Sequence, residues 1–339
     1  MRRIMMPAMP VMIAAAGALV LTAGSAAAES YNLTLSGASP GGLWSRIGRG
    51  VDAAIAAAHP GSTITYQTSS GGLANIALVS RGKVPMGIAV DGDLVLARNG
   101  TKPFKAPIRN VRALIRVYSP SARFQAQHAI INRDFAKRHN ITSFKDIAAK
   151  KIAVRVAINR RGNLDSEIGR LVLKHAGLPL ATIKANGGRV VYAASREITS
   201  LMLDRRIDMT VYGIAYKHAR IREVARGLDV TLLQIPKPVA EQVAKETGGK
   251  TCLFKAAEYA FIDKDINSVC HGAVIVVNEK MDDKLAYELA KSIVTQIEKY
   301  KTGHRLLAKV TTRATLTEPS VIPFHPGAAK YFREAGLLK

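Results

Sequence analysis

Segments typical of β-strands and of α-helices alternate along the whole chain, and this alternation constrains the fold more than any other feature. The strand-like run YNLTLSG (31–37) leads into a segment in which apolar residues recur every fourth position from Leu43 to Ile55. The strand-like run STITYQT (62–68) leads in the same way into GGLANIALVSRG (71–82). Strands that alternate with helices predict parallel sheets with helices on both faces. We therefore expect an α/β fold built from mostly parallel sheets.

The first 28 residues have the features of a secretion signal. Arg2 and Arg3 give a positive start, residues 10–22 are largely apolar, and residues 26–28 supply the small residues of a cleavage site. We expect residues 1–28 to be removed on export, which makes the mature chain a soluble periplasmic protein. Its length, about 310 residues, exceeds that of a typical single domain and predicts two lobes.

The balance of charges is strongly basic, with 49 Lys and Arg residues against 25 Asp and Glu residues and a formal net charge of +24. Such an excess favours anionic partners: a small anion, an acidic membrane surface or nucleic acid. The basic residues are spread along the chain without interleaved aromatic residues, and no zinc-finger, helix-turn-helix or RNA-binding motif accompanies them. We therefore expect no nucleic-acid partner. A cationic protein that binds the cell envelope is an alternative.

Cys252 and Cys270 are the two cysteines of the chain. In an exported protein such a pair predicts one disulfide, and two buried thiols are the alternative. The sequence has no C-x-x-C motif and no pair of histidines at the spacing of metal ligands. We therefore expect no metal site. No cofactor is expected either.

Residues 37–41 spell Gly-Ala-Ser-Pro-Gly, which matches the G-x-S-x-G nucleophile elbow of serine hydrolases. Pro40 argues against Ser39 as a nucleophile, because the oxyanion hole of an elbow uses the backbone N–H of the next residue and proline has none. Nothing in the sequence singles out one histidine as a general base. We therefore expect a protein that is not an enzyme.

Glycine-bearing loops precede three of the expected helices. Such loops leave backbone N–H groups bare at helix N-termini, where they attract anions. Arg161 on the third loop would pair with a carboxylate, and a surface arginine at a loop tip is the alternative. Asp91, at the end of a strand, would accept an ammonium group or orient a loop, and a helix cap is the alternative. The candidate ligand contacts are Ser36, Ser39, Gly41 and Trp44 on the first loop, Ser70, Gly71 and Asn75 on the second, Asp91, and Arg161, Gly162 and Asn163 on the third.

These loops resemble those of the TAXI family of TRAP-transporter solute receptors, which are extracytoplasmic binding proteins of ion-coupled organic-acid importers. The segments that carry the resemblance are SGASPGGLWSRIG (36–48), TSSGGLANIALVSRGKVPMGIAVDGD (68–93), ITSFKDIAAKKIAV (141–154) and the C-terminal IPFHPGAAKYFREAGLLK (322–339). The C-terminal segment is the most telling, because members commonly end with His-Pro-Gly-Ala, an aromatic residue and Glu-x-Gly-Leu.

The resemblance implies a two-lobed periplasmic binding protein of the second type. The chain would cross between lobes near residues 120–128 and 265–275. Lobe I would comprise residues 29–124 and 272–339, and lobe II residues 125–271. The cleft between the lobes would hold the ligand, with Tyr212 added to the contacts named above.

The resemblance also implies a function: capture of a small organic anion, such as a carboxylate or an acidic amino acid, and its delivery to the membrane subunits of a TRAP-type importer. Contact with the membrane would occur only through the transporter. The third loop, AINRRGNLDSE (157–167), is longer and more cationic than the family's Gly-Pro-x-Gly-Ser-Gly loop, which favours a di- or tricarboxylate over glutamate. A receptor for an ABC importer on the same fold is the alternative.

Overall fold

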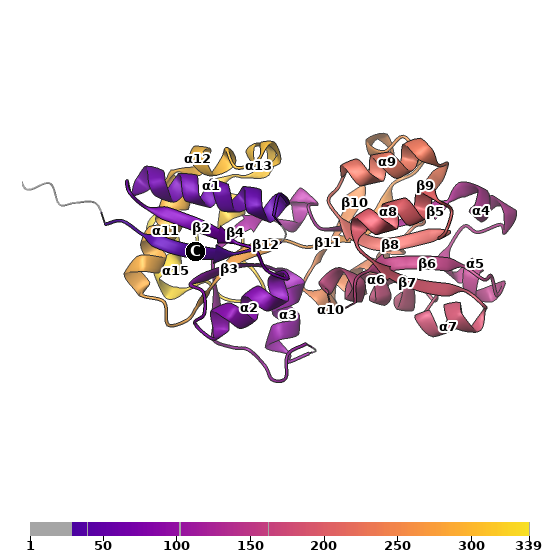
Figure 1. The fold of residues 1–339 in the computed structure, drawn as a ribbon, viewed down its shortest axis with the longest axis horizontal. Helices are drawn as coiled ribbons and strands as arrows, with labels where there is room; N and C mark the ends of the chain where they lie inside the picture. Colours follow the sequence, from indigo (N-terminus) through magenta and orange to yellow (C-terminus); the bar gives the residue numbers. More distant parts are fainter. Residues whose placement is uncertain (1–28, 39, 102, 162, 339) are drawn as a thin grey trace, which may run out of the picture.

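The computed structural model describes residues 29–38, 40–101, 103–161 and 163–338, which form two bodies side by side (Figure 1). Each body is a β-sheet with helices packed against it. The expected signal segment lies outside the described residues. None of the described helices is long and apolar enough to cross a membrane.

The first sheet has five strands in the order β2-β1-β3-β12-β4. Strand β1 runs parallel to β2 and β3, whereas β12 runs antiparallel to β3 and β4. The strands are β1 (Asn32–Ser36), β2 (Thr63–Gln67), β3 (Met86–Val90), β4 (Val111–Tyr118) and β12 (Ala273–Asn278).

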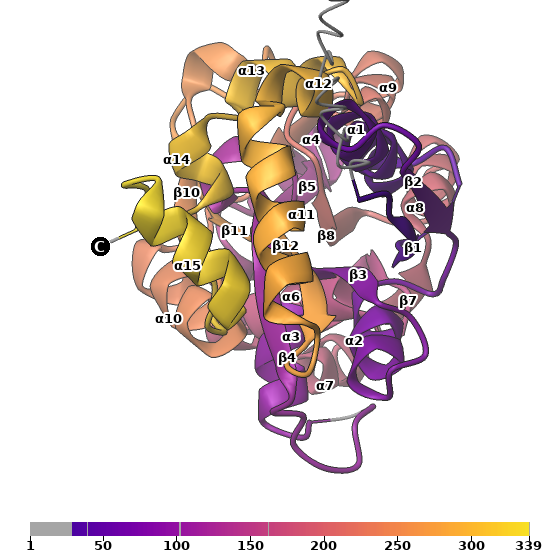
Figure 2. The same cartoon turned by 90° about the vertical axis from the view of Figure 1, so that its left-hand side faces the viewer.

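Helices cover both faces of the first sheet, as the side chains of β12 show. Ala273, Ile275 and Val277 belong to the core under α1 and α11, while Val274 and Val276 belong to the core under α2 and α3. This two-residue period is that of a strand buried on both faces. The helices of this first body, which faces the viewer in Figure 2, are α1 (Leu43–Ala58), α2 (Gly72–Ser80), α3 (Asp91–Arg98), α11 (Asp283–Thr295), α12 (Ile297–Lys301), α13 (Arg305–Val310), α14 (Arg313–Leu316) and α15 (Pro326–Glu334).

The second sheet has seven strands in the order β10-β11-β5-β8-β6-β7, with β9 paired to β5. Only the β8-β6 and β6-β7 pairs are parallel. The strands are β5 (Ala126–Asn132), β6 (Arg155–Asn159), β7 (Arg189–Ala193), β8 (Met209–Ile214), β9 (Val230–Leu232), β10 (Lys250–Phe254) and β11 (Ile266–Cys270). The helices of this second body are α4 (Arg133–Arg138), α5 (Phe144–Ala149), α6 (Leu164–His175), α7 (Leu180–Ala185), α8 (Ser195–Leu203), α9 (Ala219–Gly227) and α10 (Lys237–Thr247).

The α/β class is confirmed, but both sheets are mixed rather than mostly parallel. The reason is the path of the chain between the sheets. It leaves the first sheet after β4 and returns through β11 and β12, so β12 runs against both of its neighbours. In the second sheet, β5 likewise runs against β8, β9 and β11.

The chain passes between the bodies twice, after Tyr118 and after Cys270. The short helix η1 (Pro120–Ala122) lies on the first passage, and η2 (Ala256–Glu258) lies in the second body. Cys252 and Cys270 form a disulfide that joins the neighbouring strands β10 and β11. The lobe boundaries given above stay a prediction.

Candidate functional site

A cleft of about 760 Å³ lies between the two bodies. This volume is within the range of small-molecule sites. The first body contributes residues of both the first and second glycine-bearing loops, and the second body contributes the start of α6 and Gln125. The cleft therefore brings together all three loops that the sequence singled out, through Trp44, Ser70, Gly71 and Asn163.

The first loop reaches the cleft through Ala38 and Trp44. Its shape depends on Tyr66, whose ring fills the space beside Gly37 and whose hydroxyl accepts a hydrogen bond of 2.6 Å from the Ala38 N–H. The Trp44 indole N–H donates to the hydroxyl of buried Tyr118 at 3.3 Å, which fixes the ring against the wall. Ser39 lies outside the described residues.

The second loop ends at Gly71, whose φ of 115° is a conformation that favours glycine. No side chain caps α2, and its own first turn has no acidic residue, although Oδ2 of Asp93 from α3 lies against Gly72. Among the described residues, the N–H groups of Gly72 and Leu73 have no hydrogen-bond partner. Helix α1 likewise has no side-chain cap at Gly42 within the described part of the chain. These two helix ends retain their attraction for anions.

The third loop differs from the other two. The side chain of Asn163 caps α6 by accepting a hydrogen bond of 2.9 Å from the Ser166 N–H, and Asp165 lies in the first turn. This helix end is therefore already partly neutralised. The guanidinium of Arg161 stacks on the ring of Tyr192 at 3.7 Å and does not line the cleft. Gly162 lies outside the described residues.

Ser36 and Asn75 support the loops from beneath and do not line the cleft. Both are fully buried, and the Ser36 hydroxyl donates to Asn75 Oδ1 at 2.7 Å. The Asn75 amide nitrogen donates to the carbonyl oxygens of Gly37 and Ile88, each at 2.8 Å. The Ser69 hydroxyl also donates to Asn75 Oδ1, at 2.6 Å. Asn75 thus ties both glycine-bearing loops of the first body to strand β3.

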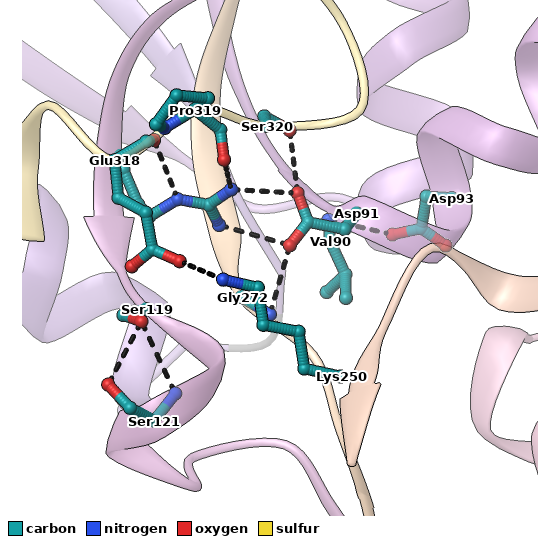
Figure 3. A network of polar contacts seen from close by, with 11 residues as sticks. Val90, Asp91, Asp93, Ser119, Ser121, Lys250, Gly272, Glu318, Pro319 and Ser320 are labelled. Carbon is teal, nitrogen blue, oxygen red and sulfur yellow. Dashed lines mark hydrogen bonds and ion pairs between the residues drawn. The ribbon is translucent and has the colours of Figure 1, made fainter. Parts of the chain in front are cut away.

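Asp91 lies at the passage between the bodies and not on the cleft (Figure 3). Its carboxylate accepts hydrogen bonds from Arg116 at 3.0 and 3.2 Å, from the Gly272 N–H at 3.1 Å and from Ser320 at 2.6 Å. Arg116 in turn donates to the carbonyl oxygens of Glu318 and Pro319. Asp91 therefore anchors the return of the chain into β12.

Two further candidates also lie off the cleft. Tyr212 is 1% exposed, on β8, and packs in the core of the second body near His128. Gly41 is exposed, with a φ of 71°, and forms the turn before α1. We leave these residues, together with Ser36, Asn75, Asp91 and Arg161, out of the binding site proposed below.

The cleft also contains two carboxylates that the sequence analysis did not select, Asp93 of α3 and Asp165 of α6. Burial, with a smaller contribution from the charges of Asp165 and Asp91, raises the pKa of Asp93 to about 7, and the hydrogen bond from the Val90 N–H acts in the opposite direction. Burial raises the pKa of Asp165 to about 6, and the hydrogen bond from Gln125 acts in the opposite direction. The cleft therefore contains two carboxyl groups that hold a proton more readily than an ordinary aspartate does.

The sequence does contain a signal for both residues. Each carboxylate falls two residues after a candidate that was selected, Asp93 after Asp91 and Asp165 after Asn163. Acidic residues in the first turn of a helix are common because they favour the helix dipole, so the pattern alone indicates a cap. Among the described residues, no group of three or more His, Cys, Asp or Glu side chains could hold a metal ion.

Two solved structures align with this chain over most of its length. PhnD1 from Prochlorococcus marinus in complex with methylphosphonate aligns with a TM-score of 0.51 at 9% identity, over 91% of this chain and 99% of that one. MatC from Rhodopseudomonas palustris with bound malate aligns with a TM-score of 0.50 at 10% identity, over 82% of this chain and 88% of that one. At such identities the likeness shows the fold alone, which is that of periplasmic solute-binding proteins.

The sequence itself matches a family model. Residues 35–336 match the model of the NMT1-like family. This match covers both bodies and all three glycine-bearing loops. The chain therefore belongs to the NMT1-like family.

Proposed function

We propose that this chain is an exported solute receptor that captures a small organic acid in the cleft between its two bodies. The observation that carries the proposal is the convergence of three loops, from both sheets, on one cleft of about 760 Å³. A ligand held there contacts both bodies at once, so binding favours their closed arrangement. Malate and methylphosphonate, the ligands in the two solved structures, are both small acids.

The anionic group of the solute binds at the open N-terminus of α2, beside Ser70 and Gly71. Two exposed cations, Arg81 and Lys105, lie on the rim of the same cleft. Neither has an ion-pair partner among the described residues. They attract an anion towards the cleft, and the bare N–H groups then hold it. The receptor needs no catalytic group or cofactor for this task.

The membrane partner that we propose is a TRAP-type importer, on the resemblance of the loops and of the C-terminal segment to the TAXI family. An ABC importer is the alternative. Uptake of the identified solute into cells that express the receptor with each importer distinguishes them. Uptake through a TRAP-type importer stops when the ion gradient is collapsed, whereas uptake through an ABC importer follows the ATP supply.

Thermal unfolding of ligand-stripped protein tests the proposed function. A ligand that binds only the folded chain adds about 2.7 kcal/mol of stability at a concentration 100-fold above its Kd. For a chain of this size we expect the midpoint to rise by roughly 4 °C. The panel comprises mono-, di- and tricarboxylates, phosphonates and amino acids.

A matched pair of variants in the second loop tests whether the rise of the unfolding midpoint comes from binding at the N-terminus of α2. Ser70→Asp places a negative charge at the N-terminus of α2 and is expected to abolish the shift, because the charge repels the anionic group. Thr68→Asp adds the same charge to an exposed residue of the same loop that does not line the cleft, and is expected to retain the shift. The absence of a shift with every compound of the panel contradicts the proposed function.

A further inference from the structure

One face of helix α2 lines the cleft from the start of the helix to its end. The residues of α2 and its flanks that line the cleft recur three or four positions apart, which is the spacing of one face of an α-helix. They are Ser70, Leu73, Ala74, Ala77, Ser80 and Arg81. At nine residues, α2 is about 13 Å long. The cleft therefore continues from the glycine-bearing loops along α2 as a groove, which we call the α2 groove.

The opposite wall of the α2 groove is the segment that follows α3. Phe104 and Ile108 of this segment line the cleft and pack against the core beneath α2 and α3. The Ile108 N–H donates to the Ala97 carbonyl oxygen of α3 at 2.8 Å, which holds the segment in place. Both walls belong to the first body, so closure of the two bodies does not fill the groove.

Helix α2 is apolar on the face that lines the groove as well as on the face that packs against the sheet. Ile76 and Val79 are buried, while Leu73, Ala74 and Ala77 on the groove side are half-buried. The helix contains no charged residue. A helix at the surface of a protein normally carries polar residues on its outer face, and α9 follows this rule with charged residues that are exposed. The apolar outer face of α2 therefore indicates an apolar partner.

The size of the cleft also exceeds what a four-carbon acid requires. Its volume of about 760 Å³ lies in the upper part of the range for small-molecule sites. A four-carbon acid held at the start of α2 would leave the walls beside Ala77 in contact with water. Burial of these walls stabilises a complex in proportion to the apolar area removed from water. Because the groove and the rest of the cleft form one continuous cavity, an extension of the solute reaches the groove without leaving the site.

We propose that the α2 groove binds an apolar tail of the solute, so that the solute is a monocarboxylic acid with an aliphatic chain longer than four carbons. The polar end lies between the two bodies, and the chain runs past Leu73, Ala77 and Phe104. A second carboxylate at the far end of the chain would lose its contact with water against apolar walls, which is costly. This inference rests on the proposed function and names its class of acid, which differs from the di- or tricarboxylate expected from the third loop.

Calorimetric titration of ligand-stripped protein with acetate, butyrate, hexanoate and octanoate tests the inference. These acids share one carboxylate and differ only in the length of the chain. We expect the affinity to rise about twofold to fourfold with each added methylene, the upper figure being that of complete burial. Suberate, which has the length of octanoate and a carboxylate at each end, is expected to bind at least about tenfold more weakly than octanoate.

A matched pair of variants locates the tail. Ala77→Leu fills the α2 groove and is expected to lower the affinity for octanoate about tenfold, while the affinity for butyrate changes by less than about twofold. Leucine is a good helix former and the position is half-buried, so the variant is expected to fold, which circular dichroism checks. Ala57→Leu makes the same substitution at an exposed position of α1 that does not line the cleft, and is expected to bind octanoate as the native chain does.

Four results overturn the inference and leave the proposed function standing. The first is an affinity that does not depend on chain length, which leaves the groove to a protein partner. The second is octanoate binding that survives unchanged in Ala77→Leu, and the third is suberate binding as tight as that of octanoate. The fourth is binding of other acids of the panel above but of none of the alkanoates. If no compound of either set binds, the proposed function fails and the inference fails with it.

Discussion

Arg116→Met is expected to lower the free energy of unfolding by about 3–5 kcal/mol, the cost of leaving one partner of a buried ion pair without the other. Arg116 and Asp91 are each 2% exposed, and their two hydrogen bonds measure 3.0 and 3.2 Å. In the variant the charge of Asp91 stays buried without its ion-pair partner. Only the Gly272 N–H and the Ser320 hydroxyl then donate hydrogen bonds to it. Urea unfolding followed by circular dichroism measures the difference.

Arg112→Met is the matched control for this prediction. Arg112 lies on the same strand, β4, and pairs with Glu279 at 2.6 Å, but the two side chains are 26% and 38% exposed. Its loss is expected to cost less than about 1 kcal/mol, as is usual for ion pairs in contact with water. Equal destabilisation by the two variants would contradict the role that we assign to the buried pair.

The Asp91–Arg116 pair lies where the chain passes from the second body to the first. Gly272 lies between β11 and β12, and any side chain there would collide with Arg116. Beside it, Lys250 of the second body pairs with Glu318 of the first at 2.8 Å. The pair therefore holds the chain where it passes from one body to the other, and Figure 3 shows these groups together.

The second prediction with a large expected effect is a loss of folding stability at low pH, caused by the buried side chain of His128. His128 is fully buried on β5, where its ring nitrogens lie 3.0 Å from the Ala126 carbonyl oxygen and 3.0 Å from the Tyr259 hydroxyl. Burial lowers the pKa of His128 to about 3 from an ordinary value of 6.5. The unfolded chain therefore binds a proton at this residue before the folded chain does. The stability that depends on neutral His128 is complete above pH 6.5 and is lost as the pH falls towards 3, by an amount on the order of 4 kcal/mol.

Comparison of the native chain with His128→Gln isolates this contribution. The variant cannot take up the proton, so its free energy of unfolding is expected to fall less steeply between pH 6.5 and pH 4. His139→Gln, at an exposed position, is the control and is expected to keep the native slope. Parallel slopes for the native chain and His128→Gln would contradict the assignment. Urea unfolding at a series of pH values supplies the measurement.

Asp93 and Asp165 change the free energy of unfolding with pH in the direction opposite to His128. For this reason the contribution of His128 is isolated only by comparing the native chain with the variant. Because their pKa values are raised in the folded state, the stability they contribute is present at low pH and is lost as the pH rises through about 6 to 7. His271, whose pKa burial lowers to about 4, acts in the same direction as His128. The pH profile of the native chain alone is the sum of these effects.

Much of the fold follows from local patterns in the sequence. The apolar stripe from Leu43 to Ile55 forms α1, and the run AVIVVN forms the buried strand β12. The direction of β12 does not follow from any local pattern. It depends on the passage of the chain through the second sheet, which is a long-range property, and for this reason the expectation of mostly parallel sheets was wrong.

The candidate site was only partly predictable for a related reason. A glycine-bearing loop before a helix indicates a helix N-terminus, and Gly71 and Asn163 lie on the cleft as such patterns suggest. Whether a polar side chain turns to the cleft or beneath the loop depends on packing. Asn75 turns inward because the carbonyl oxygens of Gly37 and Ile88 lie within its reach. Asp165 reaches the cleft because Gly213, on a distant strand, leaves space for it.

Trp44 offers the most direct test of the central claim, that the cleft joining the three loops holds the solute. It is the only tryptophan of the chain, and it lines this cleft. Titration of ligand-stripped protein with a solute identified by thermal shift is expected to change the tryptophan emission in a saturable way, with the same Kd as calorimetry gives. Binding heat without any change in the emission of Trp44 would show that the solute binds elsewhere and would contradict the account.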